Sequence, residues 1–111
     1  MASFLALSQT WGFTLQVVEE EQLLSLGEAA LQLYPPLTIS KDNEDCMAIR
    51  CRLGSFDFLS TGDMPAARER DFVETYDDLE SIEVILAGHH GSDTSGCEDF
   101  LAALTPEVSI V

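Results

Sequence analysis

The chain has 111 residues, 46% of them hydrophobic, and its 20 acidic residues against 5 basic ones give a formal net charge of −15. This length suits one small domain over residues 1–111, and the negative charge disfavours nucleic-acid binding through a basic patch. No signal peptide and no apolar run approaching the ~20 residues of a membrane span is present, so the chain itself is expected to be soluble. Three cysteines without Cys-x-x-Cys spacing predict neither a disulfide framework nor a zinc knuckle.

The first half of the chain predicts a short helix followed by β-hairpins. Residues 2–10 are compatible with a helix that ends at Trp11-Gly12. Strands are predicted at residues 13–17, 23–26, 29–34, 46–53 and 56–60, with tight turns at Gly27-Glu28 and Gly54-Ser55. In residues 46–53, Met47, Ile49, Cys51 and Leu53 alternate with Arg50 and Arg52, which places the two sets on opposite faces.

A polar loop is predicted between these hairpins, at residues 37–45. Asp42, Glu44 and Asp45 are acidic, but the spacing and the glycine of an EF-hand are missing. A calcium loop is therefore not predicted.

The second half alternates strands and helices. Helical spacing over residues 64–80 predicts a helix, and residues 82–87 form a short aliphatic run typical of a buried strand. Ser95-Gly96-Cys97-Glu98 has the capping-box pattern of a helix start, and residues 108–111 predict a last strand. We therefore expect an α/β (α+β) fold, with a mixed β-sheet and helices on one face.

Polar side chains follow two of the predicted strands. His89 and His90, the two histidines of the chain, stand between Gly88 and Gly91 after the buried strand, and Asp63 follows the strand at 56–60. Open α/β sheets build sites at such strand ends, and a carboxylate with an imidazole forms half of a divalent-metal site. The alternatives are that the histidines are ordinary loop residues and that Asp63 is the N-cap of the helix that follows it.

Two motifs carry a family resemblance. Ser-Thr-Gly-Asp at residues 60–63 and Ala-Gly-His-His-Gly-Ser-Asp-Thr-Ser at residues 87–95 resemble the metallo-β-lactamase-like domain of ComEC-type DNA-internalisation competence proteins. Residues 24–36, the polar loop up to Cys46 (where a serine is common) and the closing segments at 100–101 and 106–111 also look like that domain. The resemblance implies a four-layer αββα sandwich.

One departure from the family pattern is clear. Such enzymes carry an earlier His-x-His-x-Asp-His motif, which supplies most of the metal ligands, and this chain has no histidine before His89. We therefore expect residues 1–111 to correspond to the C-terminal half of the domain, without the first half, and to be inactive alone.

The resemblance implies a metal-dependent hydrolase, a phosphodiesterase or nuclease that acts on DNA during uptake. Asp63 and His89 would be the metal ligands, and His90 would join them in the catalytic site. His90, Ser92, Thr94 and Ser95 would lie beside the substrate phosphate. The metal would be Zn or Mn in the complete domain, with none expected to be bound by this chain alone.

The resemblance also implies partners and a location. The partners would be the rest of a parent chain, with the first half of the domain and a membrane channel, and DNA. The parent would lie in the bacterial cell membrane with this domain outside the cytoplasm. Self-association through an uncovered sheet face is a further expectation. Three alternatives stay open: an enzyme that completes its site across a dimer, a non-catalytic acidic interaction module, and a hydrolase of this fold with another substrate.

Overall fold

The computed structural model describes residues 2–39 and 45–111. Within these residues, three α-helices, one 3-10 helix and six strands occur in the order α1 (Ala2–Trp11), β1 (Gln22–Leu26), β2 (Ala29–Tyr34), β3 (Ala48–Leu53), β4 (Phe56–Ser60), α2 (Ala66–Thr75), β5 (Val84–Leu86), η1 (Gly88–Gly91), α3 (Glu98–Leu104) and β6 (Val108–Ile110). Most of the predicted polar loop, residues 40–44, lies outside the described residues, and with it Asp42 and Glu44.

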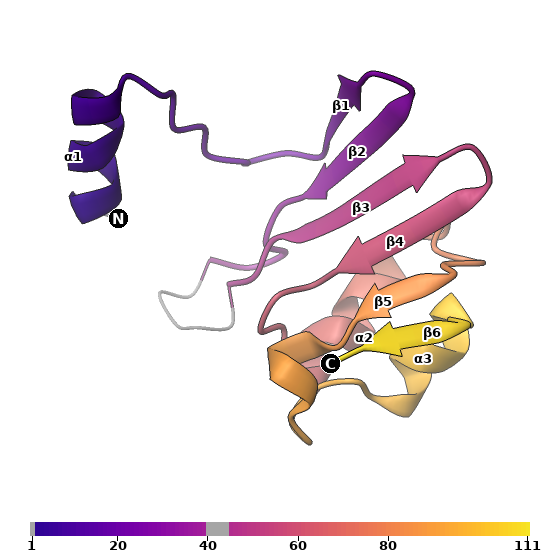
Figure 1. Cartoon of the computed structure of the whole chain (residues 1–111). Helices are drawn as coiled ribbons and strands as arrows, with labels where there is room; N and C mark the ends of the chain where they lie inside the picture. The colour runs from indigo at the N-terminus through magenta and orange to yellow at the C-terminus, as the bar shows by residue number, and fades with distance from the viewer. Residues whose placement is uncertain (1, 40–44) are drawn as a thin grey trace.

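One sheet holds the six described strands in sequence order, β1-β2-β3-β4-β5-β6 (Figure 1). The pairs from β1 to β4 are antiparallel hairpin pairs, and β4–β5 and β5–β6 are parallel. Parallel neighbours require crossover connections, which α2 and α3 supply. The expected α+β class and mixed sheet are thereby confirmed.

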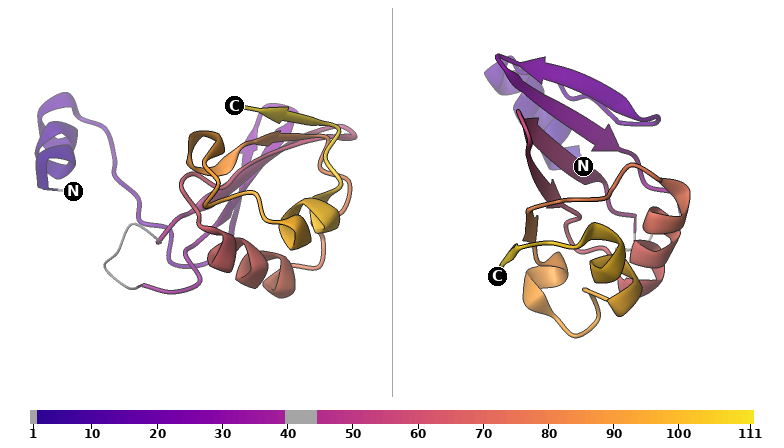
Figure 2. Two further views of the ribbon diagram at one scale, coloured as in Figure 1. Left: turned by 90° about the horizontal axis from the view of Figure 1, so that it is seen from below. Right: turned by 90° about the vertical axis from the view of Figure 1, so that its right-hand side faces the viewer.

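Helices α2 and α3 lie on the same face of the sheet (Figure 2). This is expected because the two crossover connections have the same handedness and proceed in the same direction across the sheet. The core between helices and sheet joins Leu59 and Ile85 of the strands to Phe72 and Phe100 of the helices. Helix α1 lies apart from the sheet (Figure 1), and its Phe4, Leu5, Leu7 and Trp11 are exposed.

The opposite face of the sheet is apolar and uncovered. Directly paired residues share a face, so the register defines this set. Within the strands it consists of Leu24, Leu26, Ala29, Leu31, Leu33, Ile49, Cys51, Leu53, Phe56, Phe58, Val84, Leu86, Val108 and Ile110, with Gln22 and Ser60 as its polar members. Seven of these residues are more than 40% exposed, from Leu86 at 42% to Leu26 at 68%. We call this set the bare sheet face.

The covered face holds a buried ion-pair network. Arg50, 2% exposed, donates from Nε to Asp57 Oδ1 at 3.0 Å and from Nη1 to the Asp78 carbonyl at 2.6 Å. Arg52 Nε reaches the same Asp57 oxygen at 2.9 Å. The prediction that Arg50 and Arg52 lie opposite Ile49 and Cys51 is confirmed.

Several expected element bounds were wrong. Residues 13–17 form no strand, and α2 spans Ala66–Thr75 where a helix over 64–80 was expected. The predicted capping box is also wrong, because Cys97 is the N-cap residue of α3 and the Ser95 hydroxyl instead donates to the Met64 carbonyl at 2.7 Å.

Candidate functional site

Parallel pairing brings the two polar segments together. Ser60, the last residue of β4, pairs with Leu86, the last residue of β5. Because the carboxyl ends of parallel strands lie at one edge of a sheet, the segments that follow the two strands leave it side by side. We call them the Asp63 loop (residues 61–65) and the His loop (residues 88–97).

Asp63 and His90 face each other across these loops. Asp63 Oδ1 lies 3.8 Å from His90 Nε2, and both side chains are exposed, at 53% and 90%. His89 makes a different contact: its Nδ1 lies 3.1 Å from the Thr94 hydroxyl. The structure therefore brings Asp63 to His90, whereas His89 is directed to Thr94 within its own loop. The expectation that Asp63 and His89 hold a metal stays a prediction.

Asp63 does not cap helix α2. The N-cap residue is Pro65, and among the described residues no side chain hydrogen-bonds to cap this helix. The alternative that Asp63 is the N-cap of this helix is thus wrong, and its carboxylate lies at the surface next to the His90 imidazole.

Both histidines adopt a left-handed backbone conformation. Their φ angles are +46° for His89 and +56° for His90, within the 3-10 helix η1, which begins at the buried Gly88. Non-glycine residues avoid this region at a cost of about 1–2 kcal/mol each, and such strain clusters at functional sites. The loop therefore holds two consecutive residues in a conformation that side-chain-bearing residues avoid, as Ser81 and Thr105 do singly elsewhere.

The two loops are fixed to each other by hydrogen bonds. The His89 amide donates to the Gly62 carbonyl at 3.0 Å, and the Ala66 amide donates to the Thr94 carbonyl at 2.9 Å. The Ser95 hydroxyl donates to the Met64 carbonyl at 2.7 Å. These contacts hold the strand-end site as one unit before any ligand arrives.

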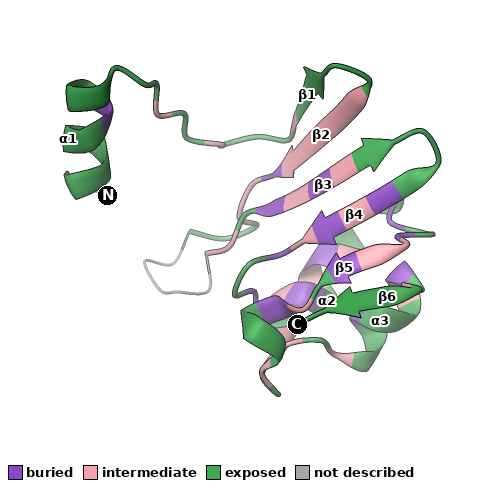
Figure 3. Cartoon of the chain, in the orientation of Figure 1, coloured by how far each residue is buried: buried purple, intermediate pink, exposed green. Residues whose placement is uncertain are grey.

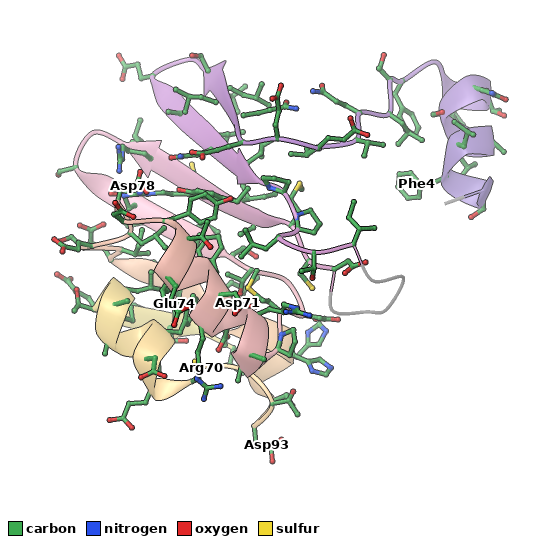
Figure 4. The ribbon with its side chains drawn as sticks, turned by 180° about the vertical axis from the view of Figure 1, so that it is seen from behind. Phe4, Arg70, Asp71, Glu74, Asp78 and Asp93 are labelled. Carbon is green, nitrogen blue, oxygen red and sulfur yellow. The ribbon has the colours of Figure 1, made fainter. Side chains whose placement is uncertain are left out.

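The hydroxyls expected beside a phosphate occupy different positions. Ser92 Oγ and Thr94 Oγ1 lie 3.0 Å apart on the outer part of the His loop, and Ser92 Oγ also accepts the Thr94 amide at 3.3 Å. The Ser95 hydroxyl is committed to the Met64 carbonyl. Asp93 projects at the tip of this loop, away from α2 (Figure 4). Ser92 and Thr94 thus lie on the outer part of the loop, and their expected place beside a phosphate stays a prediction.

Cys46 is a neighbour of Asp63 that the sequence did not indicate as a site residue. Burial raises the pKa of its thiol, the backbone of Asp63 hydrogen-bonds to it and opposes the rise, and the charges of Asp63 and Asp45 add to it. Cys46 is packed against the core. Its position in the sequence, remote from both motifs, gave no signal of this contact.

Asp63 and His90 are the two neighbouring side chains here that could donate to a metal ion. No group of three or more His, Cys, Asp or Glu side chains within residues 2–39 and 45–111 is arranged to hold a metal. Zinc sites use three or four protein ligands, so Asp63 and His90 fit part of a site. The remaining donors would have to come from residues beyond this pair.

The fold and this edge of the sheet define an α+β protein with a strand-end site of carboxylate and imidazole groups. No family model matches the chain. It is 39% identical over 70 residues, 63% of its length, to Recombination protein 2 of Haemophilus influenzae, and 35% identical over 69 residues, 62% of its length, to Competence protein ComA of Neisseria gonorrhoeae. It is 23% identical over 103 residues, 90% of its length, to ComE operon protein 3 of Bacillus subtilis.

These relatives are much longer than the chain. The matches cover 8%, 10% and 13% of the three proteins, respectively. A solved protein of unknown function from Enterococcus faecalis V583 superposes with a TM-score of 0.48 at 14% identity, over 67% of this chain and 17% of that one. Within the described part of the chain, no helix has the length and apolar character needed to cross a bilayer.

Proposed function

We propose that the chain is part of a metal-dependent hydrolase domain of a competence protein, in which it helps to cleave DNA during uptake. The observation that carries this proposal is the 3.8 Å approach of Asp63 and His90, which two different strands deliver to one edge of the sheet. Similarity to proteins named for competence and recombination supports the biological context.

Each site residue has a role in this proposal. Asp63 and one of the two histidines would bind a divalent cation, Zn or Mn, and the other histidine would lie beside the substrate. The Ser92 and Thr94 hydroxyls would donate hydrogen bonds to a phosphate group. When bound, such a metal supplies a water of lowered pKa and polarises the phosphoryl group.

The parent protein would supply what this chain lacks. Its net charge of −15 repels a phosphate backbone, so DNA would have to be held by residues elsewhere in the parent or by the metal. The bare sheet face would be covered by the first half of the domain, and the parent would sit in the bacterial membrane with this domain outside the cytoplasm. The small share of each relative that the chain matches supports a longer parent.

A non-catalytic interaction module is the second candidate. It is favoured by two observations: the described residues bring only two metal donors together, and a whole sheet face is apolar and uncovered. An enzyme completed across a dimer and a hydrolase with another substrate are further alternatives.

Calorimetric titration of the chain with Mn²⁺ and with Zn²⁺ tests the proposal, with Asp63→Asn as the matched variant. Weak binding that Asp63→Asn abolishes supports a half site. Tight binding with hydrolysis of single-stranded DNA would support a dimeric enzyme, and no binding of either metal would favour the interaction module. Repeating the nuclease assay with a protein extended toward its N-terminus then tests whether added residues complete the site.

A further inference from the structure

Glu69 of helix α2 is a fully buried carboxylate outside the strand-end site. Its exposure is 0%, and its Oε1 and Oε2 atoms accept the amides of Gly96 at 2.7 Å and Cys97 at 2.9 Å. A buried carboxylate is costly unless it is hydrogen-bonded, and hydrogen bonds from amides to a charged acceptor are among the stronger ones. The two amides satisfy one oxygen each.

The same carboxylate also lies against the start of the His loop. If residue 88 carried a side chain, its Cβ atom would lie 3.4 Å from Glu69 Oε1 and 3.0 Å from the Ser95 Cβ. Glu69 is therefore hydrogen-bonded to the end of the loop that carries His89 and His90 and lies close to its start at Gly88. Gly88 is buried at this point, so the loop has little room to move toward the helix.

Helix α2 links this contact to Asp63. The helix begins directly after the Asp63 loop and packs against α3, which begins directly after the His loop. Glu69 lies in the first turn of α2 and accepts hydrogen bonds from the residues that precede α3. The side chain is thus placed to fix one loop relative to the other.

We propose that Glu69 is a positioning residue, whose carboxylate holds the end of the His loop on α2, close to the start of the loop at Gly88, and thereby sets the distance between His90 and Asp63. Its consequence for metal binding rests on the proposed function, but the positioning itself does not. A simple cap of α3 would stabilise that helix without affecting the loop next to Asp63.

The test compares Glu69→Gln with Glu74→Gln. Glutamine keeps the size of the side chain but turns an NH₂ group toward one of the two amides, which leaves that amide without an acceptor. Glu74 lies on the same helix with its side chain exposed (Figure 4), so its variant makes the same charge change without touching the loop. Phe100→Leu serves as a third variant, because it loosens the core without altering the carboxylate.

The first measurement is amide hydrogen exchange at His89, which bonds to the Gly62 carbonyl and so reports how the two loops are joined. We expect exchange about tenfold faster in Glu69→Gln, relative to amides of β3, and unchanged in Glu74→Gln. The proposal is overturned if His89 in Glu69→Gln exchanges at the wild-type rate. It is also overturned if Phe100→Leu accelerates this exchange equally when urea is used to give both variants the same free energy of unfolding. Should Glu69→Gln fail to fold, Glu69→Asp, which keeps the charge on a shorter side chain, is judged by the same comparison.

The second measurement is Mn²⁺ titration of the same variants. We expect Glu69→Gln to weaken Mn²⁺ binding about tenfold, as loss of an orienting residue does, and Glu74→Gln to leave it unchanged. If the wild-type chain binds no Mn²⁺, the proposed function fails, while the exchange measurement still decides the role of Glu69. Unchanged Mn²⁺ affinity in Glu69→Gln would contradict the positioning role at the metal site.

Discussion

Nε2 of His90 lies 3.8 Å from Oδ1 of Asp63, although the two residues follow different strands. Ligand bonds to zinc are about 2 Å long for both nitrogen and oxygen, so two donors at this separation can share one ion without a large rearrangement. The structure pairs this carboxylate with His90, whereas Nδ1 of His89 lies 3.1 Å from the Thr94 hydroxyl. The neighbouring histidines therefore have different positions, and substitution can separate their roles.

The first prediction concerns these two histidines. His90→Ala should lower Mn²⁺ or Zn²⁺ affinity by about tenfold or more, because it removes the imidazole that faces Asp63. His89→Ala should have a smaller effect, and calorimetric titration at constant pH measures both. The opposite order of affinities would assign the metal to His89, as the family resemblance implies.

The second prediction concerns the strained backbone at His90. Its φ of +56° suits glycine, and its side chain is 90% exposed, so removing the side chain costs little packing. His90→Gly should therefore be more stable than His90→Ala by about 1 kcal/mol in urea unfolding, while both lose the imidazole. Ser92→Gly against Ser92→Ala is the control, since Ser92 has a φ of −62° and should show no advantage for glycine. Equal stability of the two His90 variants would argue against backbone strain in this loop.

The third prediction concerns the buried carboxylate of Asp57. Asp57→Ala removes the closer of the two carboxylates that pair with the buried Arg50 guanidinium, leaving only Asp78 at 3.5 Å, and should cost about 3 kcal/mol at pH 7. Asp99→Ala is the control, because the Arg70–Asp99 pair is exposed at 52% and 70% and should contribute less than about 1 kcal/mol. Urea unfolding measures both values.

This stabilisation by Asp57 should depend on pH. Burial acts to raise the pKa of Asp57, but the hydrogen bonds and charges of Arg50 and Arg52 outweigh burial and hold the pKa below its ordinary value. A carboxyl group with a lowered folded-state pKa stabilises the protein above its unfolded-state pKa of about 3.9, and this contribution disappears as the pH falls through the folded-state value. The difference between wild type and Asp57→Ala should thus be constant near neutrality and shrink below about pH 4. A difference that grows on acidification would contradict this assignment.

The fourth prediction concerns the bare sheet face. Its exposed apolar side chains should cause the chain to self-associate at high concentration, which sedimentation velocity detects. Val108→Lys, at a position that is 52% exposed on this face, should shift the chain toward monomer. Leu101→Lys, on helix α3, should leave the association unchanged. A strict monomer at every concentration would exclude this behaviour.

Local patterns in the sequence predicted most of the elements correctly. Strands β2 and β4 have the expected bounds, and β1, β3, β5 and β6 formed within two residues of theirs, because alternation and glycine turns define short strands locally. Residues 13–17 were wrongly assigned a strand. Their alternation is real, but in the described residues no neighbouring strand pairs with them, and extended segments need partners for their backbone groups.

The site was predictable in outline and not in detail. Glycines after apolar strands located Asp63, His89 and His90, because strand ends are where an open sheet places its polar groups. The contacts that decide their geometry join distant parts of the chain: Glu69 with Gly96, and Ser95 with Met64. A capping pattern at residues 95–98 could not reveal that a carboxylate of helix α2 accepts the amides of Gly96 and Cys97, just before α3 begins. Burial could not be predicted from local sequence either: strand β6 is exposed although its sequence is apolar (Figure 3).

The bare sheet face also affects the thermodynamics of unfolding. The folded monomer already exposes one face of its sheet to water. Unfolding therefore exposes less additional apolar surface than it does in a domain of equal length with both sheet faces covered. Heat-capacity increments and denaturant m-values scale with that area, and covered domains average about 12–15 cal/mol/K per residue. The isolated chain should therefore fall below that average, with a flatter stability curve and a shallower denaturation slope than its length suggests.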